Sequence, residues 1–113
     1  DREWALEVMR RAREIIGVEY ESSGKADLFR RLQAGLVRNA SEDIYEAWKN
    51  ELGMTVGALK VALHRLRERF RKALESIVLE TVLRPEDLAE EMRYLRKALT
   101  RNVSIAISSP DQA

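Results

Sequence analysis

Apolar side chains recur every three or four residues along most of this chain, which is the period of an amphipathic α-helix. The pattern predicts five helices, at residues 2–20, 25–36, 42–52, 56 to about 83 and 85 to about 100. No segment alternates as a strand would, so we predict an all-α, five-helix domain. The positions expected to form the apolar stripes are Trp4, Val8, Met9, Ala12, Ile15, Ile16, Leu28, Phe29, Leu32, Leu36, Ile44, Ala47, Trp48, Leu52, Leu59, Leu63, Leu66, Phe70, Ala73, Leu74, Ile77, Leu88, Met92, Leu95 and Leu99.

Local signals mark the ends of these helices. Residues 22–24 (Ser-Ser-Gly) interrupt the first helix, and residues 37–41 read as a loop in which Ser41 is placed to N-cap the third helix. Arg84 ends the fourth helix, because a following proline disfavours helical geometry. Pro85 in turn suits the first position of the fifth helix.

The most informative segment is residues 52–66, which joins the third and fourth helices. Gly53 stands where a helix C-terminus favours a residue with positive φ, and Thr55 is placed to N-cap the next helix. Trp48 and Leu52 supply the apolar residues at the two inner positions of the first helix, and Met54 is the apolar residue expected beneath the turn. This order is typical of a helix-turn-helix, whose second helix enters the DNA major groove.

Charge is distributed unevenly, although the net charge of this 113-residue chain is only +1. Residues 55–74 hold six Lys or Arg against one Glu, whereas residues 75–91 hold six acids against one Arg. We therefore expect a basic surface on the first part of the fourth helix and a separate, acidic fifth helix.

The predicted DNA-binding residues all lie at the start of, or along, the fourth helix. Lys60 and Arg65 carry donors suited to guanine edges or phosphates, and the cations farther along are expected to bind phosphates. Accordingly, Lys60→Ala and Arg65→Ala should weaken specific binding, and Arg71→Ala should weaken binding to all duplexes alike. For His64, a DNA contact and an ordinary surface position are both open. The full set is Thr55, Gly57, Ala58, Lys60, Val61, His64, Arg65, Arg67, Arg69, Arg71 and Lys72.

The composition argues against catalysis. Cysteine is absent and His64 is the only histidine, which excludes thiolate sites and a histidine metal cluster. No Gly-rich phosphate loop is present, and neighbouring acids such as Glu90 and Glu91 diverge by about 100° on a helix. We therefore expect no enzyme activity, catalytic residue, metal, cofactor or small-molecule substrate. No run of about 18 apolar residues is present, so we expect no membrane partner.

The chain divides into four segments. We expect an N-terminal helical segment at 1–40, a helix-turn-helix with a long second helix at 41–83, an acidic helix at 84–101 and a flexible tail at 102–113. The chain begins inside an apolar-periodic pattern and carries no signal peptide, so we expect a fragment of a longer, cytoplasmic protein.

Three other interpretations stay open on the residues alone. The basic face can be an ordinary solvated surface, since Lys and Arg are good helix formers. The domain can belong to another class of helix-turn-helix regulator. It can also be a helical adaptor that binds protein through its acidic fifth helix and does not bind DNA.

Several segments resemble extracytoplasmic-function (ECF) type RNA polymerase sigma factors, in particular a subgroup frequent in planctomycete-like bacteria. The resemblance covers residues 1–99, and its most specific part is residues 57–67. The segments that carry it are residues 1–5 (Asp-Arg-Glu-Trp-Ala), Glu19-Tyr20, residues 24–29 (Gly-Lys-Ala-Asp-Leu-Phe), residues 52–67, and the step from Val82 to Pro85 that leads into the acidic last helix.

The resemblance implies a sigma region 4 domain, with a helix-turn-helix of the winged-helix-like DNA-binding superfamily. Such a domain reads the minus-35 promoter element and docks on the β-flap of core RNA polymerase; an anti-sigma factor is a further partner to consider. The region that melts the minus-10 element is missing from this sequence, so the fragment is expected to bind without initiating. Matching positions imply a phosphate contact for Arg69 and base or backbone contacts for Gly57, Lys60, Val61, His64 and Arg65.

Two residues depart from the family pattern. Lys49 stands four positions before the turn glycine, where a small residue is usual, and must extend into solvent or open the angle between the helices. Val56 replaces the usual acid beside Gly57, which removes a favourable charge from the helix N-terminus and exposes an apolar group. Both changes are expected to weaken DNA binding or alter its specificity.

Overall fold

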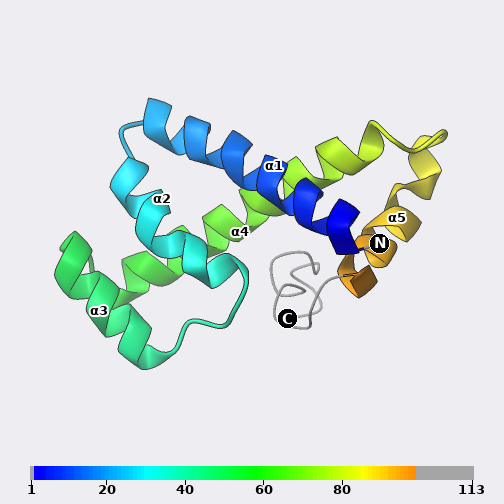
Figure 1. Ribbon diagram of the computed structural model, residues 1–113. Helices are drawn as coiled ribbons and strands as arrows, with labels where there is room; N and C mark the ends of the chain where they lie inside the picture. The colour runs from blue at the N-terminus through cyan, green and yellow to red at the C-terminus, as the bar shows by residue number, and fades with distance from the viewer. Residues whose placement is uncertain (1, 99–113) are drawn as a thin grey trace.

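The structure, a computed structural model, describes residues 2–98, and these residues form helices without any strand (Figure 1). The all-α prediction is therefore confirmed for this part of the chain. The predictions for Leu99, Thr100 and the tail lie outside the described residues. The elements are α1 (Arg2–Ser22), α2 (Ala26–Leu32), the 3₁₀ turn η1 (Gln33–Leu36), α3 (Glu42–Leu52), α4 (Val56–Leu79), the 3₁₀ turn η2 (Pro85–Asp87) and α5 (Leu88–Ala98).

The two long helices organise the molecule. In Figure 1, α1 lies across α4, and this pair forms the largest interface between elements. α2 and α3 pack near the N-terminal end of α4, whereas α5 turns back at its C-terminal end and reaches the start of α1. The first half of α4 is thus supported from one side and leaves its other side to solvent.

The core follows the predicted stripe of α4. All seven apolar positions predicted on this helix are buried, and Phe70 is the largest side chain that is fully enclosed. On α1, Ala5 and Ala12 are fully buried, and these small side chains let the two helices approach closely. Trp48 of α3 and Leu95 of α5 belong to the same core, so one continuous apolar cluster joins the helices.

The predicted caps around α3 and α4 are confirmed. Ser41 Oγ accepts a hydrogen bond from the Ile44 N–H at 3.3 Å, and Thr55 Oγ1 accepts one from the Ala58 N–H at 3.1 Å. Gly53 has a φ of 64° and donates its N–H to the Lys49 carbonyl at 2.9 Å. These bonds satisfy backbone groups that a helix end leaves unpaired, so they fix where α3 stops and α4 starts.

The structure corrects several predicted boundaries. α4 ends at Leu79 rather than near residue 83, because Thr81 turns the chain back through N–H and Oγ1 bonds to the Val78 carbonyl at 2.9 and 2.7 Å. The predicted 25–36 helix is an α-helix followed by the tighter turn η1. Pro85 opens a 3₁₀ turn rather than an α-helix, which begins at Leu88.

Two apolar residues of α1 lie differently from the prediction. Ile15 is 43% exposed and stands outside the core stripe. Trp4 is half-buried and packs against Tyr94 of α5, with the ring centroids 5.7 Å apart. Among residues 2–98, no helix is long and apolar enough to cross a membrane.

Candidate nucleic-acid interface

The first half of α4 presents its exposed face opposite the buried stripe. Going along the helix in steps of about 100°, this face carries Gly57, Val61, His64, Arg65 and Glu68. The first four are exposed and Glu68 is half-buried. We call these five residues the outer face of α4. Ala58 and Arg69 are also exposed but lie on the flank toward α1, and the exposed Lys72 extends the outer face by one turn.

The N-terminus of α4 carries no acid in its first turn, in which Val56 is half-buried. At Gly57, an added Cβ would meet no atom within 4 Å, so the backbone there is open to solvent. The partial positive charge of a helix N-terminus favours an approaching anion. This end of α4 is therefore both accessible and electrostatically suited to a phosphate.

Lys60 is held on the flank of α4 that faces α3. Its Nζ lies 5.6 Å from the centroid of the Tyr45 ring, a cation–π contact. Tyr45 in turn meets the buried Trp48 edge to face, with centroids 5.6 Å apart at 89°. Sequence reasoning missed Tyr45. The available signal was its spacing of three residues before Trp48, which places both rings on one side of α3.

Arg67 is partly committed to the fold. Its Nε donates a hydrogen bond to the Gly35 carbonyl at 3.1 Å, and burial lowers the pKa of its half-buried guanidinium. This bond joins η1 to α4. The two elements can approach this closely because residue 35 is a glycine, since a Cβ there would lie only 2.7 Å from Leu63 Cδ1. The Nε atom of Arg67 is therefore not available for the predicted phosphate contact.

Arg71 is committed to contacts within α4 more strongly. Its two terminal nitrogens pair with Glu68 Oε2 at 2.9 Å and Glu75 Oε1 at 2.6 Å. The hydrogen bond that Arg71 donates to Glu68 is the main cause that raises the pKa of Arg71 above its ordinary value. Two carboxylates outweigh its single charge, so this half-buried arginine stabilises α4 and adds no net positive charge to the surface.

Arg65 and Arg69 lie near the C-terminal end of α1. The Arg69 Cζ stands 5.4 Å from the centroid of the buried Tyr20 ring. Burial raises the pKa of Tyr20, and the charges of Arg69 and Arg65 oppose that rise. Both guanidinium groups are therefore close enough to influence this ring, while each residue stays exposed to solvent.

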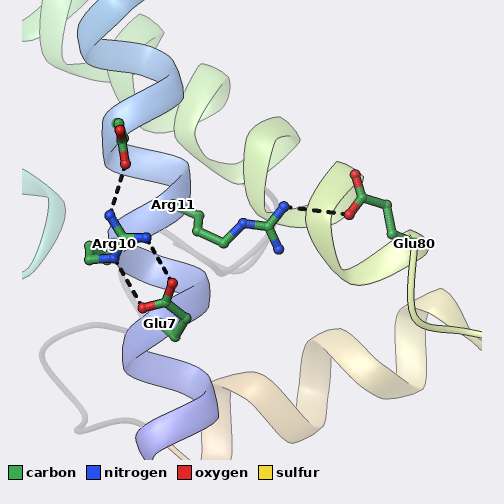
Figure 2. A network of polar contacts seen from close by, with 5 residues as sticks. Glu7, Arg10, Arg11 and Glu80 are labelled. Atoms are coloured by element: carbon green, nitrogen blue, oxygen red, sulfur yellow. Dashed lines mark hydrogen bonds and ion pairs between the residues drawn. The ribbon is translucent and has the colours of Figure 1, made fainter.

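Elsewhere, Arg10 and Arg11 of α1 are matched by acids, as Figure 2 shows. Arg10 pairs with Glu7 and with Glu14, each at 2.8 Å, and Arg11 reaches Glu80 at the far end of α4 at 3.5 Å. The hydrogen bond from Arg10 lowers the pKa of Glu7. Among residues 2–98, by contrast, Lys60, Arg65, Arg69 and Lys72 of α4 form no ion pair with an acid.

Lys49 resolves one of the two departures from the family pattern. It lies exposed, with its Nζ 3.9 Å from Glu46 Oε2 one turn earlier on α3. The long side chain therefore extends into solvent, as one of the two predicted solutions requires.

The arrangement as a whole is suited to binding an anion. It combines an exposed helix N-terminus, a small residue beside it, and donors on both flanks. Within residues 2–98, no group of three or more His, Cys, Asp or Glu is arranged to hold a metal ion. Comparison of the chain with protein-family models, curated proteins and solved structures finds no match.

Proposed function

We propose that this domain binds duplex DNA by placing the first half of α4 in the major groove. The observation that carries the proposal is the outer face of α4, which is largely exposed and includes Arg65. It begins at a helix N-terminus without an acid in its first turn, and Lys60 lies on its flank. A cationic helix of this kind fits a groove lined by phosphates and base edges.

The junction before α4 supports a helix-turn-helix. Residues 53–55 form a short turn whose glycine is left-handed and whose threonine caps α4. α3 packs against α4 and α2, so its orientation relative to α4 is held from two sides. In a helix-turn-helix, such a first helix crosses the DNA backbone while the second reads base edges.

Within this proposal, the residues of α4 have different roles. Arg65 donates to a guanine edge, and Lys60, held beside Tyr45, reaches the backbone at the α3 flank. Arg69 and Lys72 contact phosphates farther along the helix. Gly57 and Ala58 allow close approach of the helix N-terminus, and the domain has no catalytic role.

The resemblance of the sequence supports a narrower proposal. We assign the domain to an ECF-type sigma factor as its region 4, with the minus-35 promoter element as its DNA and the β-flap of core RNA polymerase as its protein partner. Retention of core RNA polymerase by the immobilised domain, compared with the Trp48→Ala variant as a misfolded control, distinguishes this proposal from another class of helix-turn-helix regulator.

A protein adaptor is the second candidate, and one observation favours it. Leu83 is 97% exposed in the loop between α4 and η2, and it lines a hollow together with Asp87, Glu90 and Glu91. An exposed apolar side chain beside these acids suits a basic, partly apolar protein partner. This candidate requires no DNA binding.

Selection from a random duplex pool at low salt tests the DNA proposal directly. The domain is expected to retain a small set of related sequences. Their common core should be as long as the stretch of base pairs that one helix contacts. Retention of no duplex would contradict the proposal and favour the adaptor. Retention without any shared sequence would leave only nonspecific binding, which contradicts a promoter-reading role.

A further inference from the structure

One apolar side chain lies exposed in the middle of the outer face of α4. Val61 is 50% exposed, whereas its apolar neighbours Leu59 and Leu63 are fully or almost fully buried. It stands one turn after Gly57 and one turn before Arg65. The valine is thus the only large apolar group among the five residues of this face.

Neither folding nor helix propensity accounts for a valine here. Half of its surface stays in water, so its burial contributes little to stability. A β-branched residue is also a weaker helix former than alanine or a straight-chain polar residue. The position therefore gains nothing evident for the isolated domain from an apolar, branched side chain.

The surroundings of Val61 leave its methyl groups accessible at the centre of a cationic surface. Gly57 has open space where a side chain would be. Lys60, the next residue back along the helix, places its ammonium over Tyr45 on the α3 flank. One turn farther along the outer face, the exposed Arg65 provides donors. Such charges favour a polyanion as the occupant of this face.

We infer that Val61 contacts the C5 methyl group of a thymine, an inference that rests on the proposed DNA-binding function. That methyl is the apolar group that a base pair offers in the major groove, and apolar side chains recognise thymine through it. Lys60 binds the backbone and Arg65 binds a guanine, while the valine selects a nearby base. The domain then reads a T·A pair at the centre of its site.

The spacing along the helix adds a constraint. Residues four apart on a helix have Cβ atoms about 6 Å from one another, which is close to two base-pair steps at about 3.4 Å each. The thymine read by Val61 should therefore lie within about two base pairs of the guanine read by Arg65. The pool-selected sequence shows this pattern directly.

Deoxyuridine provides the test, because it lacks only the C5 methyl of thymine. In the duplex selected from the pool, each thymine is replaced singly by deoxyuridine, and affinity is measured by fluorescence anisotropy. The parent should lose about threefold to tenfold affinity at one position. Val61→Ala should bind the thymine and deoxyuridine duplexes equally at that position. Val18→Ala, which removes an exposed valine of α1 outside the outer face of α4, should keep the parent's loss.

Each outcome decides between the two claims. Three results would overturn the inference while leaving sequence-specific binding intact. They are a selected site without a thymine near the guanine, a site in which no position is sensitive to deoxyuridine, and an equal loss of affinity in the parent and Val61→Ala. Loss of sequence preference in the parent would overturn the proposed function, and the inference with it. Circular dichroism tests whether Val61→Ala is folded. If that variant is not folded, Val61→Thr replaces it, since it exchanges one methyl for a hydroxyl and should show a smaller loss of affinity with deoxyuridine.

Discussion

At the scale of single residues, the structure divides the cations of α4 into two kinds. Arg67 and Arg71 bond to groups of their own domain, a carbonyl of η1 and two carboxylates of α4. Arg65 and Lys72 are exposed and stay available for a partner. Positive charge in the sequence therefore overstates the DNA-binding surface, because it counts both kinds.

Arg71 and Lys72 offer a direct comparison of these two kinds. Arg71→Ala should lower the free energy of unfolding by about 1 kcal/mol, since it breaks two half-buried, charge-assisted bonds that solvent partly screens. Lys72→Ala should change it by less than about 0.5 kcal/mol. It should instead reduce the slope of log affinity against log salt by about one. Urea unfolding and salt titrations measure these effects, and an unchanged stability of Arg71→Ala would contradict the assignment.

Tyr45 is expected to position Lys60 for DNA. Tyr45→Leu removes the ring face and should weaken binding by about twofold to fivefold, the range of an exposed cation–π contact. Tyr45→Phe should bind like the parent, because it keeps the ring. In a Lys60→Ala background, Tyr45→Leu should have no further effect. An equal loss in both backgrounds would show that Tyr45 acts independently of Lys60.

At the scale of elements, most of the fold could be predicted because its signals are local. The caps at Ser41 and Thr55 and the left-handed Gly53 depend on residues within one turn, and each was predicted correctly. The predicted C-terminal end of α4 was wrong by about four residues, because no proline or glycine marks the end at Leu79. Thr81 ends the helix through its hydroxyl, which a pattern of apolar residues does not reveal.

Two features of the candidate site that were missed depend on packing between elements, whereas the pairing of Arg71 is local to α4. Tyr45 meets Lys60 only because α3 folds against α4, and Arg67 meets Gly35 across 32 residues of sequence. Periodicity places a residue on a face but does not say which neighbouring element covers that face. The predicted roles of Lys60 and Arg67 were therefore incomplete, because each of these residues contacts an element other than α4.

The cap of α4 provides a prediction at this scale. Thr55→Ala should lower the free energy of unfolding by about 1 kcal/mol, because the Ala58 N–H loses its side-chain acceptor. Ser41→Ala removes the equivalent cap of α3 and is the matched control. Thermal unfolding should show similar losses for both variants. At a temperature where both are folded, only Thr55→Ala should also weaken DNA binding, and equal binding by the two variants would contradict a role for the α4 N-terminus.

At the scale of the whole molecule, charge and packing point to a division of labour along α4. Its first half is exposed and cationic, whereas its far end meets α1 through Arg11 and Glu80 and leads to α5. α5 is not the acidic helix that was predicted, because the acids of its first turn are offset by Arg96 and Lys97 in its last turn. α5 packs on the body through the buried Leu95. The outer face of α4 is thus supported by a core that spans α1 to α5. We expect DNA to bind only at the N-terminal end of α4.

The binding of the selected duplex by Arg65→Ala tests the central claim most directly. A bidentate arginine–guanine contact is worth about 1–3 kcal/mol, so this variant should lose about 5-fold to 150-fold affinity for the selected duplex. Its affinity for a scrambled duplex should change much less. Arg13→Ala removes an exposed arginine from α1 and controls for net charge. If Arg65→Ala instead binds the selected duplex as tightly as Arg13→Ala and the parent do, the first half of α4 is not a DNA-reading helix.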